Sequence, residues 1–241
     1  MTAFDIHAQV GRVVAERPAR SRVFDRYGID YCCGGKVTVE EVCRNKGIDP
    51  ATLIAELEAV DAKDSADGVD PLDMTMTELA DHIELTHHAY LHEELPRLSA
   101  LIDKVAAVHG AKYAWLENVR ATFADLVAEL VPHMMKEEQI LFPMIRELDH
   151  AVAAPSFHCG SVKNPIRAME QEHDGAGRAL RLLRALTGDF MPPEGACNSF
   201  RAMLDGLTAL ETDMHQHIAK ENNVLFVRAA TMEEHLRDVA Q

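Results

Sequence analysis

A histidine followed four residues later by a glutamate occurs twice in the chain, inside two segments of similar sequence. The first segment, HMMKEEQILF, contains His133 and Glu137, and the second, HIAKENNVLF, contains His217 and Glu221. The two segments lie 84 residues apart. In an α-helix, residues i and i+4 lie about 40° apart, so one helix can offer an imidazole and a carboxylate at one level. Such donors bind iron, manganese and zinc in proteins.

Each repeated segment has a further histidine upstream at nearly the same distance. His88 precedes His133 by 45 residues and His173 precedes His217 by 44, and leucines follow both upstream histidines in step. This agreement predicts a duplicated helical hairpin. Packed together, the four helices would bring four imidazoles and two carboxylates into one interior.

That number of ligands suits two metal ions. Each ion would receive two imidazoles, and Glu137 and Glu221 could bridge both ions and leave positions open. Nitrogen and carboxylate donors with open positions favour iron, with manganese next and zinc possible. Because two carboxylates offset only two positive charges, we expect an oxo or hydroxo bridge to offset more.

A single histidine on an apolar helix face is more often a core or surface residue than a ligand. The duplication argues for metal, because buried histidine and glutamate without partners would cost roughly several kcal/mol. His92, one turn after His88, is the best substitute ligand, whereas His109 is expected near the end of the bundle. Three acidic residues could orient the imidazoles from outside: Glu138, Glu172 and Asp213.

Cys32 and Cys33 are adjacent and are followed by Gly34 and Gly35, a composition typical of a turn. Adjacent thiols can bind a soft metal, exchange with other thiols or form a strained vicinal disulfide. They can equally be two small residues that close a turn, and the sequence does not choose among these roles. We expect core or bystander roles for the isolated cysteines, which are Cys43, Cys159 and Cys197.

Apolar residues recur at helical spacing along almost the whole chain, and no alternating run is long enough for a sheet, so an all-α fold is predicted. We expect a small helical module over residues 1–60, a polar linker over 61–72 and a larger domain over 73–241. In the larger domain, single apolar stripes predict an antiparallel four-helix bundle. Its helices are expected near residues 74–107, 112–147, 164–187 and 197–236.

The chain of 241 residues has a net charge of −15, which argues against a nucleic-acid partner. It contains no apolar stretch of the roughly 18 residues that a membrane helix needs, and its first residues lack the features of a signal peptide. A cytoplasmic protein without a membrane partner is therefore expected. Residues 1–48 are slightly basic and the remainder is acidic, so two subunits could pair in a homodimer.

These motifs together resemble the RIC (repair of iron centres) family, di-iron iron–sulfur cluster repair proteins with a hemerythrin-like domain. The resemblance rests on DYCCGG at 30–35, HMMKEEQILFP at 133–143, EHD at 172–174, HIAKENNVLF at 217–226 and His88. It implies a non-haem di-iron centre whose ligands are His88, His133, His173 and His217, bridged by Glu137 and Glu221. It also implies that Cys32 and Cys33 are the family's dicysteine. Family members are associated with clusters damaged by nitric oxide or peroxide, and are usually cytoplasmic and dimeric.

Three functions are compatible with these features. The first is a stress-response iron donor, in which the di-iron site holds releasable iron and Cys32 and Cys33 receive it or dock a damaged cluster protein. The second is a hemerythrin-like sensor or carrier of oxygen or nitric oxide, and the third is a di-iron reductase of nitric oxide or peroxide. The first is favoured because it uses both the thiol pair and the metal site, and it makes the chain an iron donor rather than a turnover enzyme.

Overall fold

The computed structural model describes residues 4–63 and 70–239, and within these ranges the chain is helical without a strand. The one β-type contact among them is an isolated bridge between Gln9 and Thr38. The prediction of an all-α fold is therefore confirmed. The expected domain boundary at 61–72 stays a prediction, and residues 64–69 of that segment lie outside the described residues.

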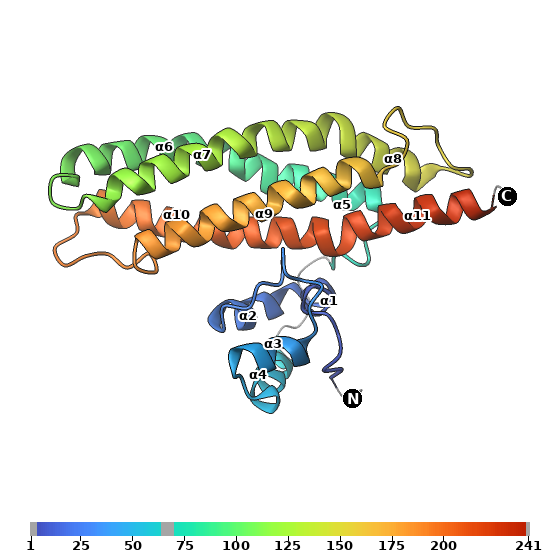
Figure 1. The fold of residues 1–241 in the computed structure, drawn as a ribbon, viewed down its shortest axis with the longest axis horizontal. Helices are drawn as coiled ribbons and strands as arrows, with labels where there is room; N and C mark the ends of the chain where they lie inside the picture. Colours follow the sequence, from blue (N-terminus) through green and yellow to red (C-terminus); the bar gives the residue numbers. More distant parts are fainter. Residues whose placement is uncertain (1–3, 64–69, 240–241) are drawn as a thin grey trace. The chain divides into compact units, whose positions relative to one another are not determined.

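Short helices form the N-terminal module, and Figure 1 shows them in blue. A capping box starts one of them, because the Thr38 hydroxyl accepts the Glu41 N–H while the Glu41 carboxylate accepts the Thr38 N–H. Gly47, with φ of 67°, ends the same helix in the left-handed conformation that glycine adopts most easily. The helices of the module are α1 (Val10–Glu16), η1 (Pro18–Arg20), α2 (Ser21–Arg26), α3 (Val39–Lys46) and α4 (Pro50–Lys63).

Four long helical rods follow, close to the four predicted ranges. The first consists of α5 (Met76–Ile83), η2 (Glu84–His88) and α6 (Ala89–His109). The second consists of α7 (Trp115–Lys136), η3 (Glu137–Leu141) and α8 (Phe142–His150). The third is α9 (Lys163–Leu186), and the fourth consists of α10 (Asn198–Lys220), η4 (Glu221–Leu225) and α11 (Phe226–Val239).

Three of the four rods contain one wide, π-helical turn, which the sequence analysis did not anticipate. In each of these turns a glutamate carbonyl accepts the N–H of the residue five positions later, instead of four. The three carbonyls belong to Glu84, Glu137 and Glu221. Such turns are rare and occur frequently at functional sites, so they direct attention to these levels of the rods.

The described residues pack into two compact units. One contains Met1–Asp81, Met144–Lys163 and His215–Gln241, and the other contains His82–Pro143 and Asn164–Met214. Each unit is built from segments that are distant in the sequence.

In the second unit, α6, α7, α9 and most of α10 run alongside one another (Figure 1). The α10 backbone approaches α6 closely at Gly206. A Cβ atom placed on this glycine would lie only 2.5 Å from Leu98 Cδ2. The Arg184 guanidinium on α9 donates to the buried Glu211 carboxylate on α10. At the end of α6, the ring centroids of His109 and Phe200 lie 5.5 Å apart. This agrees with the expected position of His109 near the bundle end.

In the first unit, two carboxylates, one half-buried and one buried, fasten loops and helix ends to their neighbours. Asp149 at the end of α8 accepts the N–H of Thr77 on α5, at 3.0 Å. Burial alone would raise the pKa of Asp149, but the hydrogen bonds from Thr77 outweigh it and lower that pKa. Glu233 on α11 is 1% exposed and accepts the Val162 N–H, at 3.1 Å. The loop between α8 and α9 is thereby held on α11.

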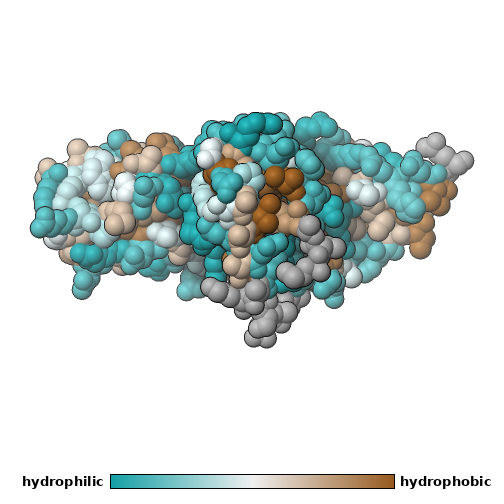
Figure 2. All heavy atoms as spheres, turned by 90° about the horizontal axis from the view of Figure 1, so that it is seen from below, coloured by the Kyte–Doolittle hydropathy of each residue, from teal (hydrophilic) through white to brown (hydrophobic). Residues whose placement is uncertain are grey.

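None of the helices within the described ranges is both long enough and apolar enough to cross a membrane. Figure 2 shows a face that is mostly hydrophilic, with small separate hydrophobic areas. Most large apolar side chains are instead buried in the cores of the units.

The capping box of α3 gives a test of the module's local stability. We expect Thr38→Ala to destabilise α3 by about 1 kcal/mol, because an alanine cannot accept the orphan N–H at the helix start. Amide hydrogen exchange along α3 should then accelerate about fivefold. Thr231→Ala, at an exposed position inside α11, is the matched control and should leave the exchange of α11 unchanged or slower. Equal effects of both changes would contradict the capping argument.

Candidate metal centre

Two imidazoles meet one carboxylate in the interior of the second unit. His88 ends η2, His133 lies in the last turn of α7, and Glu137 opens η3. Glu137 Oε2 lies 3.4 Å from His88 Nε2 and 3.3 Å from His133 Nε2. All three side chains are buried, and Glu137 has no exposed surface. The predicted pairing of His133 with Glu137 at i and i+4 is therefore present, and His88 joins it from another rod.

A third imidazole comes from α9. His173 Nε2 lies 3.1 Å from His133 Nε2, and the two ring centroids are 4.8 Å apart. Two nitrogens that bind one metal ion at about 2.0–2.1 Å stand about 3 Å from each other. The two rings are thus placed as two ligands of a single ion would be.

The second copy of the motif has the same local geometry. His217 Nε2, near the end of α10, lies 3.0 Å from Glu221 Oε1 at the start of η4, and both side chains are buried. The π-helical turn therefore begins at the glutamate in both copies, Glu137 and Glu221. This equivalence is the structural counterpart of the repeat seen in the sequence.

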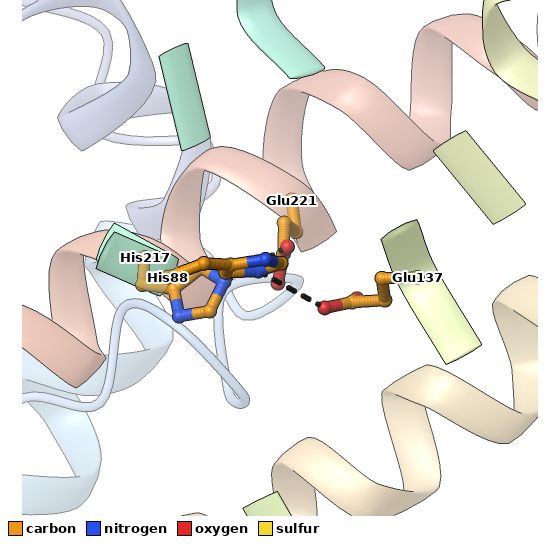
Figure 3. A group of neighbouring side chains, drawn as sticks. All are labelled: His88, Glu137, His217 and Glu221. Atoms are coloured by element: carbon orange, nitrogen blue, oxygen red, sulfur yellow. Dashed lines mark hydrogen bonds and ion pairs between the residues drawn. The ribbon is translucent and has the colours of Figure 1, made fainter. Parts of the chain in front are cut away.

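The six side chains form two groups, each of which could hold a metal ion. In each group, one ligand atom from every member lies within 4.8 Å of the others. Glu137 and Glu221 belong to both groups, as carboxylates that contact two ions would. Figure 3 shows the group that contains His88 and His217. The groups are His88, Glu137, His217 and Glu221, and His133, Glu137, His173 and Glu221.

Two further carboxylates orient the imidazoles. Glu138 Oε1 lies 2.8 Å from His88 Nδ1, and Glu172 Oε2 lies 2.8 Å from His133 Nδ1. Since an ionised carboxylate only accepts hydrogen bonds, each Nδ1 carries the proton and each Nε2 offers a lone pair to a metal. Burial alone would raise the pKa of Glu172, but hydrogen bonds from Lys136 and His133 outweigh it and lower that pKa. The expectation that Glu138 and Glu172 orient imidazoles thus agrees with the geometry.

Asp213, the third of the predicted orienting residues, lies against an imidazole that belongs to neither group. Its Oδ1 lies 2.8 Å from Nδ1 of His87, a buried histidine that the sequence analysis did not single out. The sequence signals for this pair are weak: His87 directly precedes His88, and Asp213 lies four residues before His217. His92 does not replace His88, because its side chain is 52% exposed and lies outside both groups.

Cys32 and Cys33 lie in a turn organised by Asp30. Asp30 Oδ1 accepts the N–H groups of Cys32, Cys33 and Gly34, at 3.2, 2.9 and 3.0 Å. The sulfur atoms stand 3.8 Å apart, so the thiols are not joined in a vicinal disulfide. The hydrogen bond with Cys33 and the burial of Cys32 raise the pKa of the Cys32 thiol well above its usual value.

The bundle residues fit a cation by the chemistry of their donors. Four imidazoles and two carboxylates, all buried, form a nitrogen and oxygen set that suits iron, manganese or zinc. Removing a carboxylate from water costs several kcal/mol, on the order of what a bound cation can offset. A metal-binding site accounts for the burial of Glu137 and Glu221.

Comparison with known families divides the chain into two matched regions. A domain of unknown function, ScdA_N (DUF542), matches residues 6–61. The hemerythrin HHE cation binding domain matches residues 79–229, which include all six buried histidines and glutamates of the two groups.

Curated relatives match over almost the whole chain. The iron-sulfur cluster repair protein YtfE of Enterobacter sp. (strain 638) is 38% identical over 220 residues, which is 91% of this chain and 95% of the relative. The protein of the same name from Yersinia pseudotuberculosis serotype IB (strain PB1/+) is 36% identical over the same shares. A probable iron-sulfur cluster repair protein of Haemophilus influenzae is 36% identical over 88% of this chain and 91% of its own length.

The orienting carboxylates can be tested by metal affinity. We expect Glu138→Gln and Glu172→Gln each to weaken metal binding about tenfold, because each removes the negative charge that holds an imidazole and raises its basicity. Competition with a chelator measures the affinity. Glu147→Gln, at an exposed position on α8, is the control and should retain the parent affinity. Parent-like binding by both variants would contradict the orienting role.

Proposed function

Since the chain belongs to the family of the iron–sulfur cluster repair proteins, we propose that it repairs damaged clusters by supplying iron from the hemerythrin-like bundle. The observation that carries this proposal is the pair of buried groups that share Glu137 and Glu221. A client that has lost iron needs a donor that holds the metal securely in water and yet can give it up.

The proposed cofactor is a pair of non-haem iron ions. His88 and His217 would serve one ion, His133 and His173 the other, and Glu137 and Glu221 would bridge them. When bound, the two ions would supply exchangeable iron for the client. Two carboxylates offset only two of the positive charges that the ions bring into the bundle, so the proposed centre is held less tightly than a fully neutralised one would be.

The two shared carboxylates would control how readily iron leaves. Each of them would contact both ions, so the loss of either carboxylate would remove a negative ligand from both positions at once. The imidazoles behave differently, because Glu138 and Glu172 hold the protons of His88 and His133 on Nδ1 and keep each Nε2 directed inward. We therefore assign retention to the imidazoles and release to the glutamates.

Cys32 and Cys33 are the proposed functional thiols of the N-terminal module. Their turn is bonded to the first residues of η4, directly after Glu221, since the Asn222 amide donates to the Cys32 carbonyl at 3.3 Å. A thiol pair at this position could receive released iron or dock a damaged cluster protein.

The clients in this proposal are iron–sulfur proteins damaged by nitric oxide or oxidants. Nitric oxide and oxygen are small molecules that could reach the same metal centre. A cytoplasmic location and a homodimer stay predictions from the sequence. The roles of an oxygen or nitric oxide carrier, and of a reductase, are not favoured, because relatives matched over about nine-tenths of the chain are named as repair proteins.

Iron transfer to an inactivated cluster enzyme tests the proposal. The loaded parent protein should restore activity, whereas Glu137→Leu and Glu221→Leu should restore little above background, because each removes one shared ligand. Glu147→Leu, an exposed change on α8, controls for the loss of a glutamate. Iron is counted in each protein before and after incubation.

Two results would contradict the donor role. One is that either glutamate variant revives the enzyme as well as the parent does. The other is that the parent revives it without losing iron from the bundle.

A further inference from the structure

The turn that carries Cys32 and Cys33 has more hydrogen bonds than a simple reversal of the chain needs. Successive side chains of an extended chain point to opposite sides. Here the three N–H groups gathered by Asp30 Oδ1 fold the backbone so that both sulfur atoms stand on the same side, 3.8 Å apart. Cys32 Sγ also lies 3.4 Å from Asp30 Oδ1.

The sulfur separation matches a particular coordination geometry. Two thiolates that bind one tetrahedral metal ion at about 2.3 Å stand about 3.8 Å from each other. Asp30 adds a carboxylate oxygen, and one ligand atom from each of Asp30, Cys32 and Cys33 lies within 4.8 Å of the others. A preformed spacing of this kind needs little rearrangement when an ion arrives.

The turn is also hydrogen-bonded to the helical rod that carries Glu221. The Asn223 amide donates to the Tyr31 carbonyl at 3.1 Å, and the Asn222 amide donates to the Cys32 carbonyl at 3.3 Å. The Asn223 side chain fills a slot between two glycines. A Cβ atom would lie 2.2 Å from Asn223 Oδ1 if placed on Gly11, and 2.5 Å from it if placed on Gly35.

The two copies of the metal motif differ at this point. Asn222 and Asn223 occupy the positions that Glu138 and Gln139 occupy in the first copy. Glu138 faces an imidazole of the bundle, whereas both asparagines face the thiol turn. Where the first copy has an orienting carboxylate, the second copy has two asparagines that hydrogen-bond to the turn Asp30–Gly35. We call this pair of asparagines the socket.

We propose that Asp30, Cys32 and Cys33 form a second cation site, for a thiophilic divalent ion, and that Asn222 and Asn223 hold it in shape. Three protein ligands leave the fourth position of a tetrahedral ion open, as in sites that exchange ligands. On binding, each thiol loses its proton to solvent, so two protons leave for each divalent ion that enters. The site goes beyond the repair function, since its existence does not require iron to leave the bundle.

Titration of the iron-loaded full chain with Cd²⁺ under reducing conditions tests the site, with thiolate-to-cadmium absorption in the ultraviolet as the readout. One equivalent per chain should bind tightly. Cys32→Ser and Cys33→Ser should each abolish that equivalent, and Cys197→Ser, which removes an exposed thiol near His109, should leave it unchanged. Persistence of the tight equivalent in either of the first two variants would overturn the proposal.

The socket has its own matched pair of variants. Asn223→Ala should weaken Cd²⁺ binding about tenfold, because the turn loses its hold on η4. Gln139→Ala, the equivalent and exposed position of the first copy, should have no effect. Iron is counted in both variants, and unchanged iron with weakened Cd²⁺ binding assigns the effect to the turn. Equal Cd²⁺ affinity in the two variants would overturn the role of the socket.

A measurement on the unaltered protein covers the case in which a cysteine variant does not fold. One equivalent of Cd²⁺ should protect Cys33 from alkylation, as read by mass spectrometry of peptides, while Cys197 reacts at its usual rate. Alkylation of Cys33 at the same rate with and without Cd²⁺ would overturn the site. A chain that donates iron but shows no such protection would retain the proposed function and lose only this inference.

Discussion

The burial of two carboxylates in an apolar bundle is the constraint on which the rest of this structure depends. Glu137 and Glu221 have no exposed surface, and each lies against an imidazole on its own rod. Ionised groups are removed from water at a high cost unless charge of the opposite sign is brought to them. The histidines, the orienting carboxylates and the π-helical turns all lie at this level, and a bound cation explains why they gather there.

The two copies of the motif have kept their shared chemistry and diverged around it. Both place a histidine and a glutamate one helical turn apart, and both widen the helix directly at the glutamate. In the first copy the next residue, Glu138, orients His88. In the second copy the next residues hold the thiol turn instead. The second copy of the metal motif thus carries two side chains that bind the thiol turn.

Several features followed from the sequence because they depend on local spacing. The 84-residue offset predicted the duplicated hairpin, and the pairing of His133 with Glu137 needs only the geometry of one helix. The capping box of Thr38 with Glu41 likewise depends only on a spacing of three residues. Other features escaped the analysis because no local pattern encodes them. The three wide turns are one example, and the buried pair of His87 and Asp213, from residues 126 positions apart, is another.

The sequence by itself determined the helical class, the repeat and the types of donor atom, because side-chain chemistry and helical periodicity are properties of short segments. Only the tertiary structure showed that His88, and not His92, belongs to a metal-binding group. It also showed that Asp213 contacts His87, outside both groups. Finally, it placed the Asn223 side chain in a slot between Gly11 and Gly35. Those outcomes depend on which faces of distant segments pack together, and packing of that kind is a sum of many contacts that no single stretch of residues contains.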